Sequence, residues 1–458
     1  MSPAGTATPT HAVPAPARPI THPVSRTRRT AETPTPTRPL SAPSPEPRVI
    51  GADTVVPLDD GGSVTYANFD YAASAPCLEP VHEAVTRALP YYSSVHRGAG
   101  YASQVSTEAY ENARGTVRRF LGAWERAAVV FTRNTTDAMN LLAHAAPPGT
   151  TTVVFETEHH AALLPWKRAV RLPAPATPAE AVAAAGRALA EAPAGPRLLV
   201  VTAASNVTGE IWPIAELART AHRHGARIAV DAAQLVPHRP LDMSALDVDY
   251  VAFSGHKLYA PFGAGVLAGR ADWLRAAPPY LKGGGASTAV TGRGDATRWS
   301  ADAERRHEAG TPNVLGAIAL AAACDTLTAT GWEGLIRREE ELLARLRRGL
   351  AALPKVRELA LWGEHAPRVG IVSFVVDGWN ARDAALTLSG THGIGVRDGK
   401  FCAHPFVGRL LGAGPECADG DGTAVRASFG IGTTEEHIDR LLDALTRLGR
   451  AGHGRGRR

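Results

Sequence analysis

Between residue 64 and about residue 310, short apolar runs alternate with helical patterns, and this alternation constrains the fold more than any other feature. It is typical of βαβ units, whose parallel strands are joined by helices. The expected strands span residues 128–132, 152–155, 197–202, 227–230, 250–253 and 265–267. The expected helices include 108–121, 178–191 and 213–224. In such α/β sheets ligands bind at the carboxyl ends of the strands, so the residues that follow each strand are the informative ones.

After Gly310 the pattern changes to that of a smaller α+β domain. A long helix is expected over 315–352 with a break near Gly331, then a strand at 370–375, a helix from Asn380, a strand at 394–397 and a helix over 434–448. We therefore predict a large domain over 51–312 and a small C-terminal domain over 313–447. Residues 1–50 and 448–458 are expected to be disordered tails.

The 458 residues carry a formal charge of +5, but the excess lies at the two ends. Residues 1–50 hold six Arg, two Glu and 12 of the 35 prolines, and residues 447–458 hold five Arg and no acidic residue. The region between the ends is mildly acidic. A proline-rich segment with few apolar residues cannot bury enough surface to fold. The net positive charge therefore does not indicate a folded nucleic-acid-binding domain. A scaffold or nucleic-acid-binding protein that uses its tails is the alternative from another class.

Cysteine usage and hydropathy favour a cytoplasmic protein. The four cysteines are far apart, without C-x-x-C or the paired spacing of zinc sites, so neither a disulfide framework nor a metal site is expected. No apolar run approaches the roughly 18 to 20 residues that cross a bilayer. We expect a reducing cytoplasm and no membrane partner.

Two strand ends carry a lysine and a carboxylate. Lys257 follows the strand that ends Tyr-Val-Ala-Phe-Ser-Gly-His, and Asp231 ends the preceding strand, 26 residues earlier. A buried lysine has a lowered pKa and can form a Schiff base, while a carboxylate can hold a pyridinium nitrogen protonated; pyridoxal phosphate (PLP) requires both groups. Taken singly, Lys257 is equally well explained as an ion-paired loop lysine, and Asp231 as a helix cap or a metal-binding carboxylate.

Three other strand ends add polar groups. Residues 134–137, Asn-Thr-Thr-Asp, form a strand-to-helix turn that suits a phosphate, to which Ser254 and His256 can contribute donors. His159 offers a ring to lie on a cofactor face, and the Asn206 amide can donate to a phenolate oxygen. Each motif alone is explained by an ordinary cap or core residue, but their recurrence on successive strand ends favours a PLP site. A dinucleotide site is excluded, because the glycines near 263–269 lack the G-x-G-x-x-G spacing and lead into a strand.

The order of motifs resembles the class V aminotransferase branch of fold-type I PLP enzymes, and within it the cysteine desulfurase and selenocysteine lyase-like group. The resemblance covers about residues 65–447 and is carried by Asn-Phe-Asp-Tyr-Ala-Ala-Ser at 68, His-Arg-Gly at 96, Thr-Arg-Asn-Thr-Thr at 132, Glu-His-His at 158, Ser-Asn-Val-Thr-Gly at 205, Asp-Ala-Ala-Gln at 231, Ser-Gly-His-Lys at 254, Glu-Ala-Gly-Thr-Pro-Asn at 308 and Arg-Ala-Ser at 426. It implies a large domain with a mostly parallel mixed sheet sandwiched by helices, a smaller α+β domain and a homodimer.

The resemblance also implies roles for single residues. Lys257 matches the Schiff-base lysine, Asp231 the pyridinium partner and His159 the acid/base that stacks on the ring. The phenolate neighbours are Gln234 and Asn206. The phosphate ligands are Asn134, Thr135, Thr136, Ser254 and His256, with Thr311 reaching the phosphate of a dimer partner. Arg426, with Arg397 and Asn206, is expected to bind the substrate, its guanidinium gripping the α-carboxylate.

Cys402 discriminates among the reactions of the group. It lies in Val-Arg-Asp-Gly-Lys-Phe-Cys-Ala-His-Pro and matches the nucleophile of desulfurases that act on L-cysteine. Arg397, Lys400 and His404 nearby would favour the thiolate, which can take up sulfur as a persulfide and release L-alanine. A sulfur-acceptor protein would then be a further partner. The alternative is another class V enzyme, a C–S lyase, an epimerase or an aminotransferase, in which Cys402 is a relic.

The segments around the substrate end depart from the family pattern. Gly100 stands where a second His often follows His-Arg-Gly, Gly432-Thr433-Thr434 replaces Tyr-Asn-Thr, and the stretch between His404 and Arg426 is long and rich in Gly and Asp. The amino-acid substrate and the sulfur acceptor are therefore not fixed by the sequence.

Overall fold

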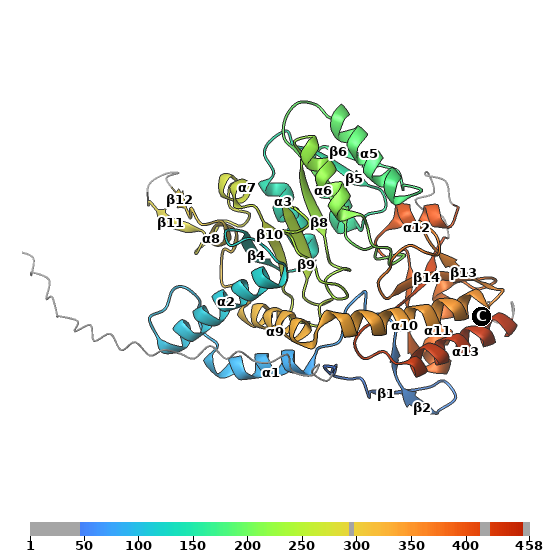
Figure 1. The fold of residues 1–458 in the computed structure, drawn as a ribbon. Coiled ribbons are helices and arrows are strands. Elements are labelled where there is room, and N and C mark those ends of the chain that lie inside the picture. The colour runs from blue at the N-terminus through green and yellow to red at the C-terminus, as the bar shows by residue number, and fades with distance from the viewer. Residues whose placement is uncertain (1–45, 293–296, 413–421, 452–458) are drawn as a thin grey trace, which may run out of the picture. The chain divides into compact units, whose positions relative to one another are not determined.

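The computed structural model describes residues 46–292, 297–412 and 422–451, and a seven-stranded mixed sheet forms its centre (Figure 1). In spatial order the strands are β4 (Ala128–Thr132), β10 (Gly265–Gly269), β9 (Tyr250–Ser254), β8 (Arg227–Asp231), β7 (Arg197–Thr202), β5 (Thr151–Phe155) and β6 (Ala169–Leu172). Only β10 runs antiparallel to its neighbours β4 and β9, and the other pairs are parallel. The six strands predicted for this sheet are all present, with ends that differ by at most two residues, and β6 was not predicted.

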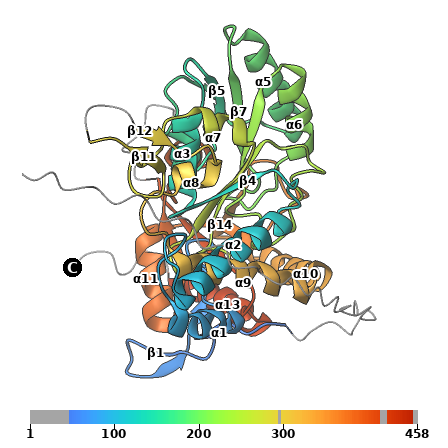
Figure 2. The same cartoon turned by 90° about the vertical axis from the view of Figure 1, so that its left-hand side faces the viewer.

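Helices cover both faces of this sheet and explain why its central strands are apolar throughout. One face packs against α1 (Glu79–Ala88), α2 (Tyr101–Phe120), α5 (Pro178–Glu191), α6 (Ile214–Arg223) and α9 (Val314–Thr330). The other face packs against α3 (Thr135–Ala145), α4 (His160–Leu163), α7 (Ala271–Ala276) and α8 (Ala303–His307). Figure 2, turned by 90°, shows α5 and α6 together on one side of the sheet. The predicted sandwich of helices around a mostly parallel sheet is confirmed.

A second, antiparallel sheet lies in the C-terminal part. Its order is β13 (Val356–Leu359), β14 (Ile371–Val376), β17 (Ala424–Ser428) and β16 (Arg397–Gly399). It shares an apolar core with α10 (Trp332–Ala351), α11 (Ala381–His392) and α13 (Glu435–Ala451). The remaining elements are β1 (Val55–Pro57), β2 (Ser63–Thr65), β3 (Ala67–Asn68), η1 (Leu89–Tyr91), β11 (Ser287–Val290), β12 (Thr297–Trp299), β15 (Ile394–Gly395) and α12 (His404–Leu410). Ala67 and Phe69 of the N-terminal segment are buried in this second core.

The long helix expected after Gly310 is broken where predicted. Gly331, at φ +89°, separates α9 from α10, and the two helices are bent by 86°. A positive φ is readily adopted only by glycine, which explains the break. No single helix in the described ranges is long and apolar enough to cross a membrane, and only this bent pair meets that criterion when taken together.

Three predicted boundaries are wrong. Helix α2 begins at Tyr101 instead of 108, because Ser103 and Ser106 donate hydrogen bonds to the carbonyls of Ser94 and Tyr91 and stabilise its first two turns. The strand expected at 394–397 is two strands: β15 pairs with β3, and β16 pairs with β17. The tail predicted over 1–50 extends too far toward the C-terminus, because Val49 is buried and bridges to Leu78. Residues 1–45 of that tail lie outside the described ranges.

Helix α13 continues to residue 451, with Leu448 buried, and residues 452–458 lie outside the described ranges. Helix α9 packs on α1 and α2, so its contacts cross the domain boundary predicted at residue 312. That boundary stays a prediction.

A buried ion network joins the two sheets. Arg368 donates to Glu210 Oε1 at 3.1 Å, to Glu358 Oε1 at 3.0 Å and to the Thr208 carbonyl at 3.0 Å. Glu210, on the loop after β7, also accepts hydrogen bonds from the N–H groups of Leu361 and Trp362. The side chains of Arg368 and Glu210 are 1% and 0% exposed, so each charge depends on the other for compensation.

Replacing Arg368 with Met should therefore lower the free energy of unfolding by about 3–5 kcal/mol, because a buried carboxylate loses its counter-charge. Urea unfolding, followed by circular dichroism, measures this as a lower midpoint. Arg345→Met removes an exposed pair with Asp439 and should leave the midpoint unchanged. Equal midpoints for the two variants would contradict the role assigned to Arg368.

Candidate active site

A cavity of about 450 Å³ lies at the carboxyl ends of the parallel strands, a size typical of small-molecule sites. Every predicted site residue except Thr311 lines it. These residues are Asn134, Thr135, Thr136, His159, Asn206, Asp231, Gln234, Ser254, His256, Lys257, Arg397, Cys402 and Arg426. Thr311 lies outside this cavity, on the loop before α9. The walls come from the central sheet and from the second sheet.

Lys257 and Asp231 follow adjacent strands and interact electrostatically. Lys257 lies in the turn after β9, and Asp231 is the last residue of the adjacent strand β8. Burial lowers the pKa of Lys257 to about 8, although the negative charge of Asp231 opposes this shift. Burial raises the pKa of Asp231, while Lys257 and the N–H of Ala233 favour its ionised form. A large fraction of Lys257 is thus a neutral amine near pH 8.

The turn between β4 and α3 forms an anion-binding corner. Asn134 caps α3 by accepting a hydrogen bond from the N–H of Asp137 at 3.0 Å. Ser254 Oγ accepts from the N–H of Thr135 at 2.7 Å and lies 2.7 Å from its hydroxyl. Gly265 permits this turn, because a Cβ there would come within 2.5 Å of the Asn134 backbone. The helix N-terminus and the hydroxyls suit a phosphate.

His159 lines the cavity as a neutral imidazole. Burial lowers its pKa to about 3, and the positive charge of Lys257 lowers it further. Its Nδ1 accepts a hydrogen bond from the N–H of Ala161 at 3.0 Å, so Nε2 carries the proton. The preceding residue, Glu158, is fully buried and accepts from the N–H of Thr202, which ties the His159 turn to β7.

The loop that carries Cys402 is held from three sides. The Asn206 side chain donates to the carbonyl of Phe401 at 2.8 Å, and the N–H of His160 donates to the carbonyl of Cys402 at 2.8 Å. The Arg426 guanidinium lies 5.1 Å from the centre of the Phe401 ring. These contacts support positive φ angles at Phe401 and Cys402 (+53° and +54°), which are uncommon for residues other than glycine. Cys402 is exposed and faces the cavity.

The cavity also contains unsatisfied buried atoms that suit a bound ligand. Within the described part of the chain, Gln234 Oε1 and Arg426 Nε have no hydrogen-bond partner. Unpaired buried polar atoms are costly unless water or a ligand satisfies them. With an amine, a carboxylate and an anion-binding corner in one cavity, the residues fit PLP bound to an amino acid.

Sequence reasoning missed three contacts of this site. The Asn206 amide, expected near a phenolate, uses one N–H to anchor the Cys402 loop. His160 supports the same loop and its ring packs 4.6 Å from that of His404. Asp70 pairs with Arg426 at 3.2 Å. Asp70 belongs to a motif that the family resemblance rests on, but a lone aspartate gave no signal of its partner.

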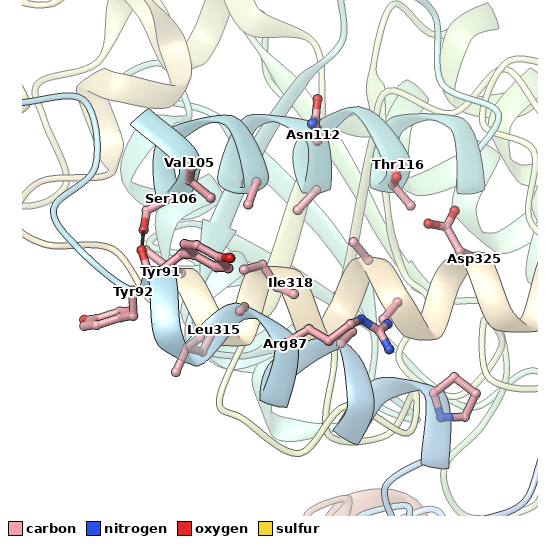
Figure 3. A pocket seen from close by; sticks show the side chains of 18 of the residues that line it. Arg87, Tyr91, Tyr92, Val105, Ser106, Asn112, Thr116, Leu315, Ile318 and Asp325 are labelled. Carbon is pink, nitrogen blue, oxygen red and sulfur yellow. Dashed lines mark hydrogen bonds between the residues drawn. The ribbon is translucent and has the colours of Figure 1, made fainter. Parts of the chain in front are cut away.

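A second hollow of about 550 Å³ lies between α1, α2 and α9, away from these residues (Figure 3). Its walls are mostly apolar and include Tyr91, Val105 and Ile318. The charged residues among its described lining are Arg87 and Asp325. It therefore lacks the convergent polar groups that distinguish the first cavity.

Comparisons with known proteins agree with this geometry. The family model described as aminotransferase class-V matches residues 67–441. The cysteine desulfurase of Dickeya dadantii is 38% identical over 372 residues, covering 79% of this chain and 86% of the relative. That of Haloferax volcanii is 35% identical over 415 residues, covering 87% and 93%.

Two solved cysteine desulfurase structures are similar to this chain over most of its length. The cysteine desulfurase CsdA from Escherichia coli superimposes with a TM-score of 0.72 at 32% identity, covering 84% of this chain and 95% of that one. The cysteine desulfurase from Thermococcus onnurineus superimposes with a TM-score of 0.74 at 32% identity and the same coverage. By its sequence and its fold, the chain belongs to the class V aminotransferase family of PLP-dependent enzymes.

Proposed function

We propose that this protein is a cysteine desulfurase that transfers sulfur from L-cysteine to Cys402 and releases L-alanine. The observation that carries the proposal is the position of Cys402, on an anchored loop in the same cavity as Lys257 and Asp231. The relatives named cysteine desulfurase, at 33–38% identity, support it. The persulfide would then pass to an acceptor protein.

The residues that would hold PLP are those of the sheet edge. Lys257 would bind its aldehyde carbon, Asp231 its ring nitrogen, and Thr135, Thr136 and Ser254 its phosphate. PLP supplies an electron sink for the charge that develops at the substrate Cα. We further propose that the chain forms a homodimer in which Thr311, outside this chain's own cavity, reaches the phosphate of the partner site.

The side chains of this chain would carry the proton and sulfur transfers. The neutral Lys257 amine would take the Cα proton, and the Nε2–H group of His159 would donate a hydrogen bond within the cavity. Arg426 would bind the substrate carboxylate, with Arg397 beside it on β16. The Cys402 thiolate would attack the substrate sulfur, so that an S–S bond forms and the substrate C–S bond breaks. The electrons of that bond stay with the substrate carbon, which takes up a proton to give alanine.

Replacing Cys402 with Ser should lower alanine formation from L-cysteine by at least about 100-fold, because the hydroxyl is a far weaker sulfur acceptor than a thiolate. The visible absorbance of the bound cofactor and its change on adding L-cysteine should persist. Cys77→Ser, which alters a half-buried thiol outside the cavity, should retain activity. Full turnover by the Cys402 variant would instead indicate a C–S lyase reaction.

The pKa of Lys257 predicts how the apoenzyme takes up PLP. Only the neutral amine is nucleophilic, and its pKa is lowered from 10.5 to about 8. The rate of PLP uptake should therefore rise with pH with a midpoint near pH 8, as followed by stopped-flow absorbance. A midpoint near that of free lysine would show that burial does not perturb this amine. Lys282→Arg, outside the cavity, should leave the profile unchanged.

A further inference from the structure

Asp70 occupies a position from which it can compete with the substrate. Its Oδ1 accepts a hydrogen bond from Nη2 of Arg426 at 3.2 Å. The Arg426 side chain is 4% exposed and that of Asp70 is 28% exposed. A guanidinium this buried needs a counter-charge, and within the described ranges Asp70 forms its only ion pair. No step of the proposed reaction uses Asp70.

The backbone around Asp70 fixes it beside Arg426. Asp70 follows β3 and bridges to Ser428, at the end of the strand β17 that carries Arg426. Ser428 donates its N–H to the carbonyl of Phe69 at 2.7 Å, and its hydroxyl accepts from the N–H of Ala72 at 2.9 Å. The N–H of Asp70 is itself bonded to the Asn68 side chain at 2.9 Å. The carboxylate is therefore held at a set distance from the guanidinium.

Arg426 can bind a second carboxylate only beside Asp70. Its Nη1 donates to the Asn206 carbonyl at 3.0 Å, and its Nη2 is committed to Asp70. An arriving carboxylate would share the remaining N–H groups with Asp70, and two adjacent carboxylates repel each other. The other charged groups that act on Asp70 are Arg397, which attracts it, and Asp398, which repels it. Arg397 is the cross-strand neighbour of Arg426 and offers a second cation.

We propose that Asp70 is a positioning residue: it serves as the internal counter-ion of Arg426 and competes for it with the carboxylate of the amino-acid substrate. This rests on the proposed function, because it takes an amino acid as the ligand. In the empty cavity Asp70 keeps the buried guanidinium paired. When the substrate binds, its carboxylate must take the remaining N–H groups of Arg426 against the repulsion of Asp70. Asp70 thus weakens substrate binding and favours release of the alanine product.

The test is Asp70→Asn in the holoenzyme, titrated with L-alanine and followed by the visible absorbance of the bound cofactor. Without the competing charge, the dissociation constant for L-alanine should fall by about tenfold. Ethylamine, which has the same amine and lacks the carboxylate, should bind both proteins equally. The apparent melting temperature without ligand should be lower for the variant, and L-alanine should raise it more than in the parent protein.

Two further variants make the result decisive. Asp70→Glu restores a carboxylate and should bind L-alanine nearly as the parent does, whereas Asp439→Asn removes an exposed carboxylate elsewhere and should change nothing. Unchanged or weaker L-alanine binding by Asp70→Asn would overturn the proposal and show that Asp70 only orients Arg426. Failure of the desulfurase assignment would appear separately, as no alanine formed from L-cysteine, and would leave the L-alanine titration readable.

Discussion

Charges that are buried together at one edge of the sheet determine how this site is built. Lys257 lies in the turn after β9 and Asp231 ends the neighbouring strand β8, so each compensates the other where water is largely excluded. Arg426 meets the same requirement with Asp70. Burial still dominates at both cations, since it lowers the pKa of Lys257 to about 8 and that of Arg426 to about 10. The outcome is an amine that can react at neutral to mildly basic pH beside a guanidinium that stays charged.

The site depends equally on the junction between the two sheets. The central sheet supplies the amine, the carboxylate and the anion-binding turn, whereas the second sheet and its loops supply Arg426, Arg397 and Cys402. The Arg368–Glu210 network and the Asn206–Phe401 hydrogen bond span this junction. Because these contacts are buried, they fix the thiol relative to the amine more firmly than an exposed loop contact would.

The anchored Cys402 loop bears on the choice of reaction. A thiol that accepts sulfur must reach the substrate while it remains exposed enough to pass the sulfur on. Cys402 meets both conditions, since it lines the cavity and is exposed. Asn206, His160 and Arg426 hold the loop in a conformation with two consecutive positive φ angles. The residue that would bind the substrate carboxylate therefore also supports the nucleophile.

The sequence alone determined six strands of the central sheet and the polar residues at their carboxyl ends, because apolar periodicity marks strands and parallel strands end at one edge of a sheet. The family resemblance, and not periodicity, supplied the cavity residues Arg397, Cys402 and Arg426. The tertiary structure decided the rest. It divided the strand predicted at 394–397 between two sheets, turned the Asn206 amide toward Phe401 and paired Asp70 with Arg426. The last two contacts join residues 195 and 356 positions apart. Such contacts leave no local periodicity or spacing in the sequence, because folding alone brings the partners together.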